Sequence, residues 1–334
     1  MKKERVLDAI NHKRTDKIPH TIEFTKDILE ILCRELDMTP DEIFDYADNH
    51  IEKINLNAGG IWVRDGFYQD EFGVVWDRTG HDKDIGMPVD VIYKNPNIDL
   101  YEFPQVQEEL LRQEIEKTLS NGRDTFKICK ISYNLYERAW SLRGMMNILM
   151  DMIENPEFTY ALFEKIFEFN MKRIKIAMEY DIDGFYFGDD YGQQRGLIMG
   201  PTMWRKYIKP VLAKQYEEVK KKGKVVIQHS CGDNNLILED FIEIGLDVYN
   251  TIQPEIYDLK KLKSQYGKDL AFWGAISTQR LLPYASPDEV KAKARETMSI
   301  LGKDGGYIAS PTHRMPQDIP VENFLALVDV FKNQ

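Results

Sequence analysis

The stretch KVVIQHSCGDNNLILEDFIEIGLDVYN occupies residues 224–250 and holds one complete structural unit. A β-prone run, KVVIQH at 224–229, is followed by a turn that contains Gly232, then by a helical stretch, and then by the β-prone run LDVYN at 246–250. A strand, a helix and a second strand in this order form a βαβ unit, whose two strands lie parallel in one sheet. The stretch therefore predicts a parallel α/β fold.

The same alternation recurs along the chain. Seven short β-prone runs are separated by helical segments: TIEF at 21–24, FKICKIS at 126–132, GFYF at 184–187, KVVIQH at 224–229, LDVYN at 246–250, LAFW at 270–273 and GYIAS at 306–310. About seven such units favour a closed TIM (β/α)8 barrel over an open doubly wound sheet, with one strand not found. We therefore expect residues 1–334 to form a single barrel domain.

Residues 61–104 interrupt this alternation. The segment WVRDGFYQDEFGVVWDRTG has Gly66, Gly73 and Gly80 as turn residues, which is typical of a hairpin. The start of the chain, MKKERVLDAINHKRTD, reads as an amphipathic helix. We expect an N-terminal excursion of helix and hairpin on the rim of the barrel, with 61–104 as an insertion.

The composition excludes several classes of protein. Of the 334 residues, 43% are hydrophobic and 30% are charged, and the formal net charge is −11; nucleic acid, which needs a basic face, is not an expected partner. No apolar run approaches the roughly 20 residues of a membrane-spanning helix, and no apolar segment follows the basic N-terminal residues as in a signal peptide. Cys33, Cys129 and Cys231 are too few for a disulfide framework, so a cytoplasmic location is expected.

Candidate metal ligands follow two of the predicted strands. In a barrel of this kind the functional side chains lie on loops after the C-terminal ends of the strands. His229 and Cys231 stand two positions apart at such an end, so both can face the barrel mouth, and His313 follows the last run. Imidazole and thiolate are typical ligands of zinc, which keeps one position open when it is catalytic. The alternatives are an ordinary buried pair and, for His313, a surface loop.

Acidic and aromatic residues stand at the other strand ends. Asp189 and Asp190 follow GFYF and could supply a metal ligand, a catalytic base with a raised pKa, or only the cap of a turn. The residues that we expect to bind substrate come from several different strand ends and are Tyr133, Glu137, Phe187, Tyr191, Gln194, Gln253, Trp273 and Arg314. Core packing is the alternative for the aromatic residues, and an ion-pair network is the alternative for Glu137.

With these residues in place, the chain resembles the uroporphyrinogen decarboxylase superfamily over nearly its whole length, most strongly from about Asp189 onward. The resemblance rests on these motifs: ERVLDAINHKRTDKIP, YERAWSLRGMMNILMDM, GDDYGQQRGLIMGPTMWRKYIKP, HSCGDNNLILEDFIEIGLDVYNTIQP, FWGAISTQRLLP and GGYIASPTHRMPQDIPVENFLAL. Such a long collinear series is specific for the superfamily and its barrel, and much less specific for the reaction.

Two branches of this superfamily differ in their site residues. The decarboxylases proper carry an arginine-rich signature near the first strand, where this chain has PHTIEFTKDI without arginine. The zinc-dependent methyltransferases that exchange methyl groups with a corrinoid protein have H-x-C after a central strand and a further ligand after the last strand. The chain is similar to this branch in His229 and Cys231, but it has His313 where those methyltransferases usually have a cysteine.

The resemblance implies a methyltransferase of the O-demethylase type. Such an enzyme moves a methyl group from a small methoxylated or methylated substrate to a corrinoid, a cobalamin-like cofactor carried by a partner protein. Zn²⁺ on His229, Cys231 and a third group such as His313 would act as a Lewis acid. Asp189 or Asp190 would assist as a ligand or proton carrier.

Two other functions remain open at this stage. A uroporphyrinogen decarboxylase-like carboxy-lyase would work without metal and would bind carboxylates through Arg138, Arg195 and Arg314. A non-catalytic barrel would bind corrinoid or another ligand without turnover. A homodimer is one assembly that the resemblance allows, since decarboxylases of this superfamily often pair.

Overall fold

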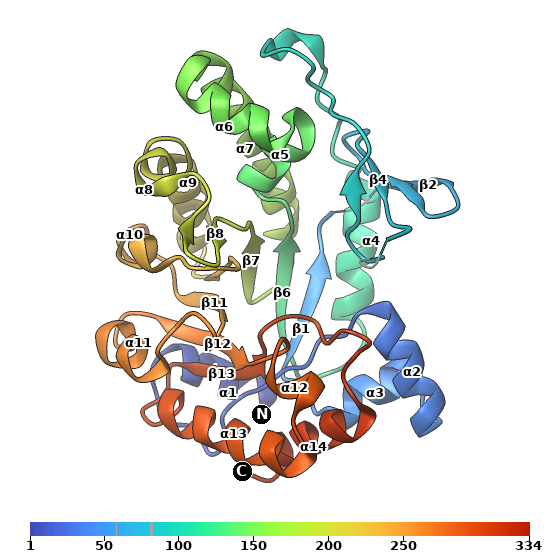
Figure 1. Cartoon of the computed structure of the whole chain (residues 1–334), viewed down its shortest axis with the longest axis vertical. Coiled ribbons are helices and arrows are strands. Elements are labelled where there is room, and N and C mark those ends of the chain that lie inside the picture. Colours follow the sequence, from blue (N-terminus) through green and yellow to red (C-terminus); the bar gives the residue numbers. More distant parts are fainter. Residues whose placement is uncertain (58, 81–82) are drawn as a thin grey trace.

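Seven parallel strands form the central sheet. The computed structural model describes residues 1–57, 59–80 and 83–334. Figure 1 shows that the sheet is curled. The strands in spatial order are β1 (Ile51–Asn55), β6 (Phe126–Ile131), β7 (Gly184–Gly188), β10 (Val225–His229), β11 (Val248–Ile252), β12 (Ala271–Ile276) and β13 (Tyr307–Pro311). Six of them coincide with expected β-prone runs. β1 does not, because Glu52 and Lys53 interrupt the apolar pattern that marks a buried parallel strand.

Regular strands do not close this sheet into the predicted eight-stranded barrel. The expected first strand, at residues 21–24, lies beside β13 without a regular ladder; the isolated bridges here join His20 to Ala309 of β13 and Phe24 to Met315. On its other side the amide of Asn49 accepts from the N–H of Ile22 at 2.7 Å and donates to its C=O at 3.1 Å. Because a side chain takes these backbone groups, no regular ladder forms, and an irregular segment occupies the place of the eighth strand.

Helices follow most strands and cover the outside of the sheet (Figure 1). α4 lies against β1, α9 against β10, and α13 against β12 and β13. The helices are α1 (Lys2–Ile10), α2 (Lys26–Leu36), α3 (Pro40–Tyr46), α4 (Glu108–Leu119), α5 (Tyr136–Arg143), α6 (Met145–Glu154), α7 (Pro156–Ala177), α8 (Gly200–Met203), α9 (Lys209–Lys220), α10 (Leu238–Glu243), α11 (Leu259–Tyr266), α12 (Leu281–Tyr284), α13 (Pro287–Leu301) and α14 (Val321–Lys332), with short 3-10 turns η1 (Ile98–Leu100) and η3 (Asn235–Ile237) and a π-helical turn η2 (Trp204–Ile208). Among the described residues, no helix combines the length and the apolar character that crossing a membrane requires.

The space inside the curled sheet is filled at its N-terminal end. Val6 and Ile10 of α1 belong to the inner apolar cluster. The other buried members of this cluster, all from the central strands, are Ile51, Phe126, Ile128, Tyr186, Ile227, Val248, Ala271, Trp273 and Ile308. α1 therefore plugs this end of the strands, and a site inside the sheet can open only at the other end.

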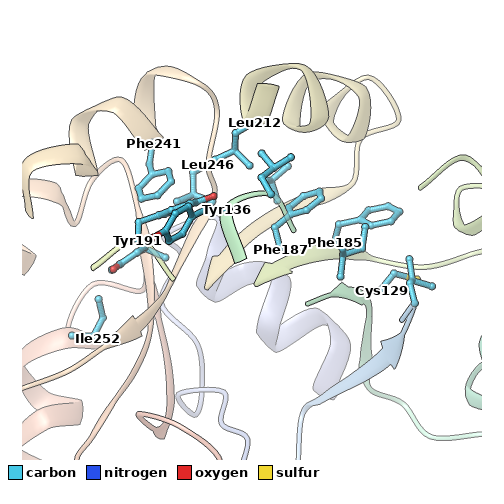
Figure 2. Packing of buried hydrophobic residues seen from close by; sticks show 14 of the residues in the cluster. Cys129, Tyr136, Phe185, Phe187, Tyr191, Leu212, Phe241, Leu246 and Ile252 are labelled. Atoms are coloured by element: carbon cyan, nitrogen blue, oxygen red, sulfur yellow. The ribbon is translucent and has the colours of Figure 1, made fainter. Parts of the chain in front are cut away.

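Alternate residues of β7 point to opposite faces of the sheet, as the period of a strand requires. Phe185 and Phe187 lie in the outer core between the sheet and the helices, as does Leu212 of α9 (Figure 2). Tyr186 lies in the inner cluster instead. The register of this one strand therefore decides which aromatic side chains can reach an internal cavity.

The insertion at residues 61–104 contains a four-stranded antiparallel sheet. Its strands are β2 (Ile61–Arg64), β3 (Phe67–Gln69), β4 (Val75–Asp77) and β5 (Met87–Pro88); residues 81 and 82 of this range lie outside the described residues. Gly66 and Gly73 form turns at φ of +72° and +79°, which suits glycine. Asp70 accepts a hydrogen bond from Arg138 of α5 at 2.6 Å, which ties this sheet to the barrel. A second, two-stranded sheet, β8 (Gly192–Gln193) and β9 (Gly196–Leu197), follows β7.

Candidate functional site

A cavity of about 570 Å³ lies at the C-terminal ends of the central strands. Each of the seven central strands contributes at least one residue to its floor, among them Asn55, Lys130, Gly188, His229, Asn250, Trp273 and Ser310. The insertion adds Trp62, Tyr68, Trp76 and Arg78 to its walls. This is the end of the strands at which α/β barrels carry their functional sites.

His229 and His313 line this cavity, and Cys231 lies beside them. Their ligand atoms, one nitrogen from each histidine and the sulfur of Cys231, all lie within 4.8 Å of one another. Cys231 Sγ is 3.5 Å from His229 Nε2. Tetrahedral zinc, with bonds of about 2.3 Å to sulfur and about 2.0 Å to nitrogen, separates two such ligand atoms by about 3.5 Å. The donor set and its spacing therefore fit a zinc ion.

The ring of His229 is oriented by Asn250, from the neighbouring strand. His229 Nδ1 lies 2.6 Å from Asn250 Oδ1, which also accepts a hydrogen bond from the Tyr186 hydroxyl at 2.8 Å. Asn250 Nδ2 donates to the carbonyl of Trp273 at 3.1 Å, which sets the amide in this orientation. Because Oδ1 can only accept, the proton of His229 is on Nδ1 and the lone pair of Nε2 faces the cavity. Metal-binding histidines are commonly oriented in this way.

Buried side chains hold the loop that carries Cys231. Asn234 Nδ2 donates to the carbonyls of Cys231 and Gly232, at 3.0 and 3.1 Å, and the oxygen of Gln253 accepts from the N–H of Gly232 at 2.7 Å. Gly232 has φ of +80°, and a Cβ on it would lie 2.3 Å from the carbonyl carbon of Gly192. The structure thus places Gln253, predicted to bind substrate, in the support of this loop.

The adjacent residues Asp189 and Asp190 have different surroundings. Asp189 is buried, and its carboxylate accepts three successive backbone N–H bonds, of 2.7 to 2.9 Å, at the start of α5. Burial raises the pKa of Asp189, while these donors oppose the rise. Asp190 lines the cavity, accepts from the N–H of Cys231 at 2.7 Å and lies 3.6 Å from His229 Nε2. Only Asp190 is therefore available to a ligand.

Burial controls protonation at the three candidate ligands. It lowers the pKa of His229 and raises the pKa of Cys231 well above its usual range, and the charge of Asp190 opposes the first shift and adds to the second. His313 is solvent-exposed, yet desolvation by the surrounding protein, and then the charge of His229, lower its pKa as well. Without a cation the group therefore holds neutral imidazoles and a neutral thiol. A divalent cation would favour the thiolate.

Glu137 lines the same cavity, and its surroundings favour the protonated form of its carboxyl group. Burial, followed by the charges of Asp190 and Asp189, raises the pKa of Glu137 well above its usual range. A carboxyl group that keeps its proton at neutral pH can donate it to an oxygen of a bound molecule. Glu137 is thus placed to act as a proton donor.

The cavity floor also contains two lysines that the sequence analysis did not single out. Lys53 of β1 pairs with Glu23 at 2.7 Å, and its Nζ lies 3.8 Å from the centre of the Tyr186 ring. Lys130 of β6 also lines the cavity. The available signal was a lysine inside an apolar strand, because lysine is rarely buried without a partner. Tyr186 could have been found from strand alternation, since it shares a face with Gly188.

The predicted substrate-binding residues divide into two groups. Those that line the cavity are Tyr133, Glu137, Trp273 and Arg314. The others are Gln253, in the loop support, Gln194, which is exposed between β8 and β9, and the buried Phe187 and Tyr191. Figure 2 shows Phe187 and Tyr191 in the outer core, where Tyr191 packs near Phe241. Their outward direction follows from the fold and not from residue type.

A second cluster, His20, Asp48 and His50, has ligand atoms within the same 4.8 Å and precedes β1 at the opposite end of the strands. Arg5 Nη1 lies 2.8 Å from His50 Nε2. Since a guanidinium only donates, Nε2 accepts and the proton of His50 is on Nδ1. The buried Nδ1 therefore has no lone pair for a metal ion, and this cluster fits a metal poorly.

Comparison with known proteins adds two findings. Residues 137–334, more than half of the chain, match the protein family described as uroporphyrinogen decarboxylase (URO-D). Among solved structures, the chain is similar to a methyltransferase from Methanosarcina mazei, with a TM-score of 0.74 and 18% sequence identity over 99% of this chain and 98% of that one. No curated protein matches the chain. At this identity the structural likeness shows a shared fold.

Proposed function

This chain belongs to the uroporphyrinogen decarboxylase family, and within that family we propose that it is a zinc-dependent methyltransferase of the O-demethylase type. It would pass a methyl group from a small methoxylated substrate to a corrinoid carried by a partner protein. The observation that carries the proposal is the convergence of His229, Cys231 and His313 at an open cavity, with the His229 tautomer already set. The fold shared with a protein named as a methyltransferase supports it.

The reaction requires cleavage of an unreactive ether bond. The bond between the methyl carbon and the ether oxygen breaks, the oxygen keeps the electron pair, and cobalt(I) of the corrinoid supplies the pair for the new carbon–cobalt bond. Zinc bound at this site would supply Lewis acidity toward the ether oxygen. The chain's own contribution is to hold that oxygen near His229 and Cys231 and to keep the methyl group accessible from the cavity mouth.

Residues around the candidate ligands can complete this chemistry. Glu137 keeps a proton that can pass to the leaving oxygen, so that the demethylated product leaves as an alcohol or phenol. Asp190 holds the N–H of Cys231 and can serve as a further ligand. Trp273 and Tyr133 offer flat apolar walls to the substrate.

A metal-free carboxy-lyase has less support. Of the arginines that it would use, Arg138 is already paired with Asp70 at 2.6 Å. Arg195 is exposed between β8 and β9 and does not line the cavity, whereas Arg314 does. That function also gives no reason for the close approach of Cys231 to His229.

Metal content tests the proposal directly. Protein purified without chelator and supplied with zinc should retain about one zinc ion per chain, measured by mass spectrometry of the metal. His229→Ala and Cys231→Ala should lose most of this zinc, since each removes one of three protein ligands. Cys33→Ala is the matched control, because Cys33 lies on α2, away from the cavity lining.

Turnover separates the remaining functions. Incubation with methoxylated aromatic compounds and cob(I)alamin should give methylcobalamin, followed by absorbance, in the wild type and in Cys33→Ala but not in Cys231→Ala. A chain that stays metal-free in the presence of zinc, or a Cys231→Ala variant with full zinc content, contradicts the proposal. Corrinoid binding without any methyl transfer would identify a non-catalytic barrel.

A further inference from the structure

Lys130 is a basic side chain in the cavity floor that has no anionic partner among the described residues. It is half-buried, and its Nζ lies 6.0 Å from the centre of the Tyr186 ring. Within residues 1–57, 59–80 and 83–334, no acceptor lies at hydrogen-bond or ion-pair distance from this ammonium group. Glu23 and Glu137 act on Lys130 through their charge alone, since neither lies at ion-pair distance from it. An unbalanced charge inside a protein is costly and calls for an explanation.

The neighbouring charges leave this end of the cavity positive. Glu23 is paired with Lys53 at 2.7 Å. Arg314, whose charge acts on Lys130, reaches Asp84 at 3.5 Å. Among the described residues at this end, Lys53 and Arg314 each have a carboxylate partner, whereas a protonated Lys130 has none. A bound anion is the ligand that would balance it.

The path from Lys130 to the candidate zinc ligands is open. β7 lies between β6 and β10, and its inward residues are Tyr186, beside Lys130 in the register, and Gly188, beside His229. Gly188 has no side chain, and the nearest atom to a Cβ placed there is 3.5 Å away. β6 and β10 are about 9 to 10 Å apart, two strand spacings. A molecule of the size of one aromatic ring with a substituent at each end can span this distance, against the ring of Trp273.

We propose that the cavity binds a small aromatic carboxylic acid, with its carboxylate on Lys130 between Lys53 and Arg314, and its methoxy group at His229 and Cys231. The assignment names the substrate class and rests on the proposed methyl transfer. The carboxylate would supply the anionic partner that no described residue gives this lysine. The cationic end would then fix the ring so that the ether oxygen reaches the other side of the cavity.

This assignment links ligand binding to proton uptake. Burial, and then the charges of Arg314 and Lys53, lower the pKa of Lys130 to about 7, while Glu23 and Glu137 act in the opposite direction. At pH 8 the amine is therefore mostly neutral in the free protein. A carboxylate beside it favours the charged form, so binding of the acid should take up about one proton.

Calorimetry of the full chain, loaded with zinc, with two matched probes tests the proposal. 4-Methoxybenzoate and 4-methoxybenzamide share the ring and the ether and differ in charge. We expect the acid to bind the wild type about 10- to 100-fold more tightly than the amide, the range of a charge-assisted hydrogen bond. Lys130→Met should lose this preference and bind the amide as the wild type does. Removal of an unpaired buried charge should leave the protein folded.

Lys130→Arg is the matched control for proton linkage. It keeps a cation that does not lose its proton, so it should retain the preference for the acid. At pH 8, titrations in buffers of different ionisation enthalpy should show uptake of about one proton by the wild type and none by Lys130→Arg. Equal affinity of the wild type for acid and amide, no binding of the acid, or an unchanged preference in Lys130→Met each overturn the assignment.

Failure of this assignment can be distinguished from failure of the proposed function. A chain that prefers the acid through Lys130 but holds no zinc and transfers no methyl group would keep the anion site and contradict the methyltransferase. Methyl transfer from a neutral ether, with no preference for the acid, would support the methyltransferase and contradict the anion site.

Discussion

The side-chain oxygen of Asn250, on β11, lies 2.6 Å from Nδ1 of His229, on the neighbouring strand β10. This contact fixes the imidazole tautomer before any ligand binds. Asn250→Ala should lower zinc affinity about 10- to 100-fold, the usual effect of removing the partner of a metal-binding histidine. Competition with a chromophoric chelator measures this affinity. Asn235→Ala, at the exposed first residue of η3, should leave zinc affinity unchanged. Equal zinc affinities in the two variants would contradict the role of Asn250 in orienting His229.

Asp189 and Asp190 should differ in what their substitution costs. Asp189→Asn replaces an acceptor of three buried N–H groups by an amide with one oxygen, so we expect a loss of about 2 to 4 kcal/mol in the free energy of unfolding. Asp190→Asn keeps an oxygen for the single N–H of Cys231 and should cost less than about 1 kcal/mol. Urea denaturation measures both. Similar costs for the two variants would show that the start of α5 does not depend on Asp189.

Gly232 allows the Cys231 loop to approach Gly192 closely. Gly232→Ala adds a Cβ that would lie 2.3 Å from the carbonyl carbon of Gly192, and it also strains a backbone at φ of +80°. We expect the backbone strain to lower the free energy of unfolding by about 1 kcal/mol and the clash to lower it by about 1 to 3 kcal/mol more. The variant should also lose zinc. Gly223→Ala, at φ of +66° with nothing within 4 Å of the added Cβ, isolates the strain alone. If both variants lose the same stability, the loop can relax around the contact.

The buried pair His20 and His50 should make the protein less stable in acid. Burial lowers the pKa of His20 to about 3 and that of His50 to about 4. In the unfolded chain both titrate near their ordinary value of about 6.5. Between these values the unfolded state binds protons that the native state does not, so the free energy of unfolding falls as pH drops below about 6.5.

The slope of that fall is measurable. Each histidine should contribute up to about 1.4 kcal/mol per pH unit between pH 6 and pH 4. Urea denaturation at several pH values should therefore give a shallower slope for His20→Gln, by about one proton, whatever its stability at pH 7. An identical slope in the variant would mean that His20 is protonated in the native state.

The two faces of β7 give a further test. Phe187→Leu changes the outer core and should cost about 1 to 2 kcal/mol of stability without changing zinc affinity. Tyr186→Phe keeps the ring but removes the hydroxyl that donates to Asn250, so zinc affinity should fall several-fold with a stability change within about 1 kcal/mol. Loss of zinc in Phe187→Leu alone would contradict the observed register.

The parallel α/β class and six of the seven strands could be predicted from the sequence. The reason is that each βαβ unit is local: the run at 224–229, its turn and the helix that follows are neighbours in the chain. Candidate ligands such as His229 and Cys231 could be proposed for the same reason, because they stand at a predicted strand end where a barrel opens. Their function as ligands stays a prediction that the metal measurements test.

Tertiary structure decided what depends on neighbours distant in the chain. It placed Tyr186 inside and Phe187 outside, because only the packing of helices on one face fixes the direction of an apolar strand. It assigned Asp189 to the start of α5 and left the sheet without a regular eighth strand. It also brought Lys130 into the cavity without an anionic partner among the described residues. The sequence determined which residue types stand at the strand ends, whereas the balance of charge between them depends on strands that meet only in the folded chain.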